Sequence, residues 1–447
     1  MAFEFKNKDI LELLLKGKRE QIQEQIDDIH PANILSILRE YNGDKLNLLH
    51  HFTDEMIALI IDYAEDDEKY EILSLFPSSK QMEIVEEMAS DELVDLLGAI
   101  QPDEANEILD KMSREDAKEL VELMHYDQDS AGGIMAKEYI SVMRNMTVKE
   151  TLELLRKEEP EAETAYYLYV LNESGQLNGV VSLRDLVISD LDVRISDIMH
   201  EKIITVPVHM DQEEVGRIFE KYDYLSMPVV DDEDRMLGII SIDDIMDVLR
   251  FENTEDIFKL AGIGEGESLN NSLKESISKR LPWLFVNLMT ALIASATVNL
   301  FQGTIQKVVV LATLMPIIAG MGGNAGTQTL TIIVRGIALG ELTFENAKRV
   351  LIKEVGVGLL AGTSIGITVG LLAFFWDQNP ILGVVIGLAM LLNMIVATIS
   401  GYFVPVILKK FHIDPALASA VFVTTVTDVL GFFFFLGLAT LFIEYLI

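Results

Sequence analysis

The chain of 447 residues divides into three stretches that differ in the spacing of their apolar positions. The last stretch contains five long apolar runs, at about 281–302, 308–339, 355–376, 381–408 and 415–446. A helix formed by each run is long enough to cross a hydrocarbon core of about 30 Å. We therefore predict a polytopic α-helical membrane domain of five spans.

The first stretch, residues 1–126, has apolar positions at spacings of three and four, which is typical of short amphipathic helices. Helix starts are predicted near Ser90, Pro102 and Ser113, because Ser and Pro favour the first positions of a helix. These starts recur about every 12 residues. Such regularity predicts an α-helical superhelix of paired short helices, each of which needs its neighbours to bury its apolar face.

The middle stretch, residues 127–250, alternates β-branched runs with helical runs and repeats itself. The segment 179–187 reads GVVSLRDLV and the segment 238–246 reads GIISIDDIM. Each copy predicts a β-α-β-β-α unit, with helices at 148–158 and 212–221 and strands at 166–171 and 227–231. The pattern predicts two successive α/β units.

This repeated unit resembles a tandem CBS module, whose family binds adenosine nucleotides or ions between the repeats. In that family the Asp of an S-x-x-D turn is placed for a ribose, and Asp185 and Asp244 match this position. The resemblance implies a nucleotide site, with ATP as a candidate ligand. Ordinary helix capping by Ser182 and Ser241 explains the same pattern, and both interpretations stay open here.

Charge separates the chain into two parts. Residues 281–447 carry seven acids and seven basic residues, so the whole net charge of −36 belongs to residues 1–280. This acidic part favours divalent cations as partners and argues against nucleic acid, although a merely solubilising surface explains it too. The chain has no cysteine, which excludes disulfides and cysteine metal sites.

Asp428 is the main candidate for function, because it is an acid near the middle of the last apolar run. An Asp there costs roughly 2.5–3.5 kcal/mol, so it should face a water-filled path, a partner or an ion. Thr424 and Thr425 share its helical face, and Asp414 is predicted at the mouth of that face. The alternative is a protonated or helix-pairing Asp, with threonines that bond their own helix carbonyls.

The second and third apolar runs carry unusual glycine patterns. Pro316 and the glycines of 320–326 predict a break in the second span, with Asn324 among the polar groups lining it. Glycine at every fourth position of 358–370 predicts a close-packing face in the third span, which we expect to contribute to dimer packing. Asn393 in the fourth span is either a pore group or a packing group.

Basic residues indicate on which side of the membrane the ends of the spans lie. They cluster at 279–280, 348–353 and 409–410, on alternate loops, and the positive-inside rule makes those loops cytoplasmic. We therefore predict a multi-pass protein of the cell (inner) membrane, with cytoplasmic N-terminal domains and the C-terminus outside. The predicted domains are 1–126, 127–250, a linking (plug) helix at 251–280, and the pore domain at 281–447.

The whole arrangement resembles the MgtE family of magnesium channels and transporters. The resemblance rests on the acidic helical domain, the tandem CBS pair, the motif PIIAGMGGNAGTQ at 316–328 and TDVLGF at 427–432. It implies a homodimer in membrane lipid with a central pore, in which Asp428 selects hydrated Mg²⁺. It also implies closure by cytosolic Mg²⁺, through ligands at Asp91, Asp95, Asp223, Asp244, Asp247, Glu252, Glu255, Asp256 and, at the pore mouth, Asp414.

Three classes of function fit these patterns. The first is a magnesium-gated magnesium channel, and hydrated Mg²⁺ suits a site with one or two carboxylates. The second is a proton- or ion-coupled secondary transporter of divalent cations, and the third is a CBS nucleotide sensor that does not transport. An enzyme is not expected, because the sequence contains neither a catalytic triad nor a phosphate-binding loop.

Overall fold

The computed structural model describes residues 2–16, 29–158, 166–264, 266–269, 271–417 and 419–447. The chain forms two compact units, Met1–Val248 and Leu249–Ile447.

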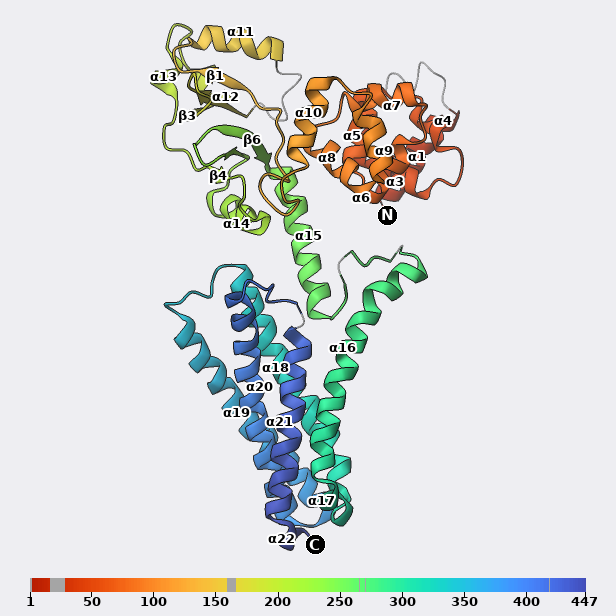
Figure 1. The fold of residues 1–447 in the computed structure, drawn as a ribbon, viewed down its shortest axis with the longest axis vertical. Helices are drawn as coiled ribbons and strands as arrows, with labels where there is room; N and C mark the ends of the chain where they lie inside the picture. Colours follow the sequence, from red (N-terminus) through yellow and green to blue (C-terminus); the bar gives the residue numbers. More distant parts are fainter. Residues whose placement is uncertain (1, 17–28, 159–165, 265, 270, 418) are drawn as a thin grey trace. The chain divides into compact units, whose positions relative to one another are not determined.

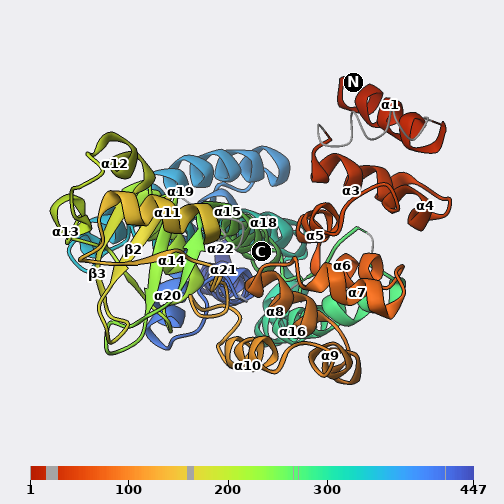
Figure 2. The ribbon, with the colours of Figure 1, turned by 90° about the horizontal axis from the view of Figure 1, so that it is seen from above.

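The first unit begins with a body of short helices (Figures 1 and 2). Their bounds are α1 (Ala2–Lys16), α3 (Pro31–Glu40), α4 (Lys45–Leu49), α5 (Asp54–Asp62), α6 (Asp66–Leu73), α7 (Ser78–Val85), α8 (Ser90–Ala99), α9 (Pro102–Leu109) and α10 (Arg114–Leu123). The predicted helix starts are confirmed, and Ser113 caps α10 by accepting a hydrogen bond from the Asp116 amide. Successive helices bury their aliphatic faces together, with Ile34, Ile60 and Leu96 fully buried.

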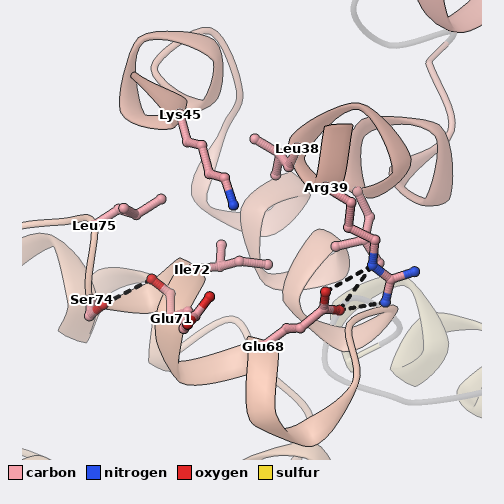
Figure 3. A pocket seen from close by; sticks show the side chains of 9 residues that line it. Leu38, Arg39, Lys45, Glu68, Glu71, Ile72, Ser74 and Leu75 are labelled. Carbon is pink, nitrogen blue, oxygen red and sulfur yellow. Dashed lines mark hydrogen bonds and ion pairs between the residues drawn. The ribbon is translucent and has the colours of Figure 1, made fainter. Parts of the chain in front are cut away.

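A polar pocket of about 300 Å³ opens between these helices (Figure 3). Arg39 donates to Glu68 on one wall, and Lys45 points into the space from the opposite side. Leu38, Ile72 and Leu75 complete the lining with apolar surface. The hydrogen bond from Arg39, opposed by burial, holds the pKa of Glu68 below its ordinary value.

Two three-stranded sheets follow in the same unit. The first has the order β1 (Ser141–Met143), β2 (Tyr167–Leu171), β3 (Leu177–Ser182), and the second has β4 (Val206–Pro207), β5 (Ser226–Val230), β6 (Met236–Ser241). In both sheets the first pair is parallel and the second pair antiparallel, which confirms the predicted repeat. The accompanying helices are α11 (Val148–Glu158), α12 (Leu183–Ile188), α13 (Ile195–Ile198) and α14 (Gln212–Tyr222).

The two repeats pack on each other through strand residues. Tyr169 of β2 is buried, and its hydroxyl lies 3.0 Å from Ser226 Oγ of β5. Residue 136 forms a bridge with Ile239 of β6. These contacts join both copies into one α/β pair.

The segment predicted as one linking helix has a different construction. Helix α15 (Ile242–Leu260) starts in the second repeat and ends at Leu260, and α16 (Leu273–Leu300) already begins before residue 280. Gly262 and Gly266 lie between them with positive φ of 69° and 68°, a conformation that glycine adopts easily. The prediction of a single helix over 251–280 is therefore wrong.

The second unit contains five helices long and apolar enough to cross a membrane among the described residues. They are α16, α18 (Val310–Ala338), α19 (Ala347–Asp377), α20 (Pro380–Lys410) and α21 (Ser419–Leu441), with short helices α17 (Gln302–Lys307) and α22 (Ile443–Leu446). Figure 1 shows α17, α22 and the C-terminus at one end of this unit, opposite the end of α15. The predicted number of spans is confirmed.

The predicted break in the second span is wrong, because α18 is one continuous helix that includes Pro316 and the glycine-rich segment. Packing explains its stability. A Cβ atom at Gly326 would lie 2.5 Å from Val423 Cγ1, so the glycine allows α21 to approach closely. Gly322 is buried against the amide of Asn393. These contacts outweigh the low helix propensity of glycine.

The glycines of the third span form the close-packing face that their spacing predicts. A Cβ atom at Gly366 would lie 2.6 Å from the Gly387 carbonyl oxygen, and one at Gly370 would lie 2.7 Å from that of Gly383. Both partners belong to α20 of the same chain. The ladder therefore packs α19 on α20, and the expectation that it serves a dimer contact is not needed to explain it.

Candidate functional site

The acid of the last span, Asp428, is partly buried in α21, nine residues after Ser419. At a rise of about 1.5 Å per residue this places it about 14 Å into the helix. Its side chain makes no hydrogen bond or ion pair with the described part of the chain. An acid in a membrane span without a protein partner is expected to serve an ion or a water-filled path.

The two threonines on its helical face bond their own helix. Thr424 Oγ1 donates to the Ala420 carbonyl at 2.9 Å, and Thr425 Oγ1 donates to the Val421 carbonyl at 2.6 Å. This is the alternative left open by the sequence for these hydroxyls. Each hydroxyl oxygen still has acceptor capacity.

Asp414 does not lie on that helix. Residues 411–417 are not helical, and α21 begins only at Ser419, so the predicted single helix from Pro415 is wrong. Asp414 Oδ1 accepts a hydrogen bond from the Ala416 amide at 2.8 Å, a local bond that competes with helix formation. Asp414 instead contacts the end of α15, because Lys259 Nζ lies 2.7 Å from its Oδ2.

Asn324 lies on α18 and is exposed, as are Thr327 and Gln328. Polar side chains on the surface of an apolar span require polar surroundings in a bilayer. Asn393 is fully buried and donates from Nδ2 to the Ile318 carbonyl at 2.9 Å, so it is a packing group.

The acids that the resemblance implies as regulatory ligands lie on several elements. Asp91 and Asp95 are in α8, and Lys69 lies 4.0 Å from Asp95. Asp223 ends α14 in the left-handed conformation, with φ of 53°. The remaining ones are all in α15: Asp244, Asp247, Glu252, Glu255 and Asp256.

These acids are not assembled into a metal site within one chain. Across the described residues, no three His, Asp or Glu side chains are placed to hold a metal ion together. The predicted ligand set therefore stays a prediction.

Asp244 is nevertheless in an unusual electrostatic setting. Burial and, to a smaller extent, the charges of Asp243 and Glu92 raise its pKa to about 6, against the lowering effect of hydrogen bonds from Ser241. Glu92 belongs to α8 of the helical body, where Lys69 pairs with it, and its charge adds a small repulsion on Asp244. A bound cation would relieve this repulsion.

Both S-x-x-D turns are helix starts. Ser182 Oγ accepts from the Asp185 amide at 3.1 Å and donates to Asp185 Oδ2 at 2.6 Å. The Ser241 amide donates to Asp244 Oδ2 at 3.1 Å. The capping interpretation is confirmed, and a ribose site at these carboxylates stays a prediction.

The sequence predicts no particular role for two charged residues, Glu354 and Lys259. The third apolar run starts at about residue 355 in the sequence, but α19 begins at residue 347. Glu354 therefore lies within this helix, where it is only 2% exposed. Its Oε2 accepts from Thr329 Oγ1 of α18 at 3.1 Å. Lys259 resembles other helix lysines in the sequence, because its contact with Asp414 forms only in the folded chain.

The fold and its acids define a polytopic membrane protein with an acidic cytosolic part and a CBS pair. Family models match in the same order: the MgtE intracellular N domain at residues 29–129, CBS domains at 131–191 and 195–250, and the MgtE divalent cation transporter at 315–438. The chain is 39% identical to the magnesium transporter MgtE of Thermus thermophilus over 325 residues, which are 72% of each protein. It is 38% identical to that of Enterococcus faecalis over 326 residues, 73% of this chain and 72% of the relative. The chain belongs to the MgtE family.

Solved structures agree for the first unit. The cytosolic domain of the Mg²⁺ channel MgtE in complex with ATP is 36% identical, with a TM-score of 0.51 over 54% of this chain and 99% of that one. The soluble part of a magnesium transporter is 33% identical, with a TM-score of 0.53 over 56% of this chain and 99% of that one.

Proposed function

We propose that this protein moves Mg²⁺ across the cell membrane through a path whose selective group is Asp428. The observation that carries the proposal is an acid in the last span without a partner among the described residues. Relatives of similar length are named magnesium transporters, which supports the choice of ion. Hydrated Mg²⁺ loses its water reluctantly, so one carboxylate per chain suits outer-sphere binding that is weak enough for release.

The path is proposed to lie between two copies of the chain. Asn324 of α18 is exposed in a single chain, although it belongs to an apolar span. A homodimer would provide polar surroundings for it and bring two Asp428 carboxylates to one pore, lined further by Thr424 and Thr425. The N-terminal unit would then be cytoplasmic and the C-terminus outside, in keeping with the basic loops.

Regulation by cytosolic Mg²⁺ is the second part of the proposal. With a net charge of −36 on residues 1–280, the cytosolic parts of a dimer repel each other when Mg²⁺ is scarce. Ions bound to the acids of α8, α14 and α15 favour the compact arrangement and so shift the equilibrium toward a closed pore. The end of α15, residues 251–260, acts as the closing element.

ATP is proposed as a further ligand of the CBS pair, with Asp185 or Asp244 at the ribose. The support is the ATP complex of a similar cytosolic domain and the placement of both carboxylates at helix starts. Magnesium flux into liposomes that contain the purified protein tests the proposed function. Flux that requires a proton gradient would favour the coupled transporter instead, and no flux would favour the nucleotide sensor.

A further inference from the structure

The end of α15 is joined to the segment before α21 by one ammonium group. Lys259 Nζ lies 2.5 Å from Glu255 Oε1 and 2.7 Å from Asp414 Oδ2. The side chain of Lys259 is only 11% exposed, so water solvates little of its charge. Two carboxylates lie against this charge and compensate it.

Neighbouring contacts hold the ammonium in this position. Leu260 packs against the buried cluster of Leu330, Val334, Ala416 and Val423. About two turns earlier along α15, Asn253 Oδ1 accepts a hydrogen bond from Arg335 Nη1 of α18 at 2.9 Å. The lysine therefore lies between an apolar and a polar contact, both made with the membrane helices.

The contact with Lys259 engages a carboxylate oxygen of Asp414 that could otherwise bind a cation. One carboxylate oxygen accepts from the Ala416 amide and the other accepts from Lys259. A hydrated Mg²⁺ is bound through carboxylate oxygens that accept hydrogen bonds from its water. The same oxygens cannot serve the lysine and the hydrated ion at full strength.

We propose that Lys259 is a tethered competitor of the transported cation at Asp414. While the end of α15 is docked, the ammonium occupies one oxygen of the Asp414 carboxylate, and a cation must compete with it there until α15 has moved away. The inference rests on the proposed cation transport and adds to it, because this contact favours the closed entrance even without a bound metal. Cytosolic Mg²⁺ then adds to a closed state that the lysine already favours.

Removal of the ammonium has a defined consequence. Glu255 and Asp414 would face each other without a positive charge between them, and their repulsion would release the end of α15 when divalent cations are absent. A divalent cation could take the place of the ammonium and restore docking. In Lys259→Met, closure therefore depends more strongly on cytosolic Mg²⁺ than in the unmodified protein.

The test measures Mg²⁺ flux through the full chain in liposomes, with the cytosolic side either chelated or at millimolar Mg²⁺. Lys259→Met keeps the length of the side chain and removes its charge, and Lys259→Arg keeps the charge. Lys274→Met is the matched control, because Lys274 is exposed on α16. We expect chelated-side flux to rise about three- to tenfold in Lys259→Met alone, with closure restored by millimolar Mg²⁺.

Flux in Lys259→Met equal to that in Lys274→Met would overturn the inference, while normal flux in the unmodified protein would leave the proposed function intact. Absence of flux in the unmodified protein would overturn the proposed function itself.

A second measurement does not depend on transport. Because the chain has no cysteine, a pair introduced at Leu260 and Ala416 reports docking through the rate of disulfide formation. In chelator, Lys259→Met should slow this rate several-fold, and Lys274→Met should not. Equal rates in all variants would contradict the competitor role even if Lys259→Met alters flux.

Discussion

Asn393 of α20 donates from its side-chain amide to the main-chain carbonyl of Ile318 in α18, at 2.9 Å. The amide is accommodated because Gly322 of α18 and Gly431 of α21 have no side chains, and a Cβ at Gly431 would lie 2.8 Å from Asn393 Nδ2. Gly431 lies three residues after Asp428, on the same face of α21. The contact thus fixes three helices near the level of the proposed selective acid.

Replacement of this amide should therefore affect both stability and transport. Asn393→Ala removes the hydrogen bond and leaves the glycine slot empty, so we expect a loss of about 1–3 kcal/mol and reduced Mg²⁺ flux. Thermal unfolding in detergent and liposome flux measure the two effects. Leu388→Ala on the exposed face of α20 is the control. Equal stability and equal flux in the two variants would mean that Asn393 does not position α21.

The glycine ladder predicts a sharp dependence on position within α19. Gly366→Leu should destabilise the membrane unit strongly, because its side chain would meet the main chain of Gly387 in α20. Gly356→Leu is the control, because it makes the same substitution in the same helix. No neighbouring atom lies within 4 Å of a Cβ at that position. Thermal stability in detergent separates them. Equal stability of the two variants would mean that α19 and α20 do not pack as described.

Regulation by cytosolic Mg²⁺ should depend on particular acids and not on total charge. Replacing Asp95, Asp223 and Asp247 by Asn should raise several-fold the cytosolic Mg²⁺ concentration needed to stop flux, because three of the proposed ligands lose charge. The control replaces three exposed acids, Asp103, Asp192 and Asp232, by Asn and therefore has the same net charge. If both triple variants close at the same concentration, the acidic surface acts only through its overall charge.

The first CBS repeat provides a pH-dependent prediction. The hydrogen bond from Ser182, opposed by burial and helped by His200, keeps the pKa of Asp185 below its ordinary value. A carboxyl group with a lowered pKa in the folded state contributes stability above its unfolded pKa and loses it as pH falls through the folded value. Asp185→Asn should thus cost about 1 kcal/mol or less at pH 7.

That cost should shrink as the pH is lowered toward 3, which thermal unfolding at a series of pH values would reveal. Ser182→Ala serves as the companion variant, because it removes the cap and the hydrogen bond to Asp185 together. A cost for Asp185→Asn that does not change with pH would contradict the role assigned to the charged carboxylate.

The sequence predicts the elements of this protein better than their contacts. Helix starts such as Ser113, the repeated strand-to-helix turns at Ser182 and Ser241, and the five spans all follow from local patterns. The continuity of α18 does not follow, because it depends on Gly322 and Gly326 meeting residues of α20 and α21. Low helix propensity is outweighed only once those partners are in place.

In the candidate site, too, the local pattern is predictable from the sequence and the contacts are not. Asp428 is recognised from the sequence because an acid within an apolar run is costly wherever the helix packs. Asp414 was misplaced on the helix, because its bond to the Ala416 amide and its contact with Lys259 depend on local and long-range geometry. Lys259 and Glu354 acquire meaning only from residues far away in the sequence.

The most direct test of the account is Mg²⁺ flux into liposomes that contain the full chain with Asp428→Ala. Asp377→Ala, which removes an exposed acid at the end of α19, is the control for the loss of one negative charge. We expect that Asp428→Ala folds normally and loses nearly all flux, while Asp377→Ala keeps its flux. Undiminished flux through a folded Asp428→Ala protein would contradict the assignment of Asp428 to the cation path.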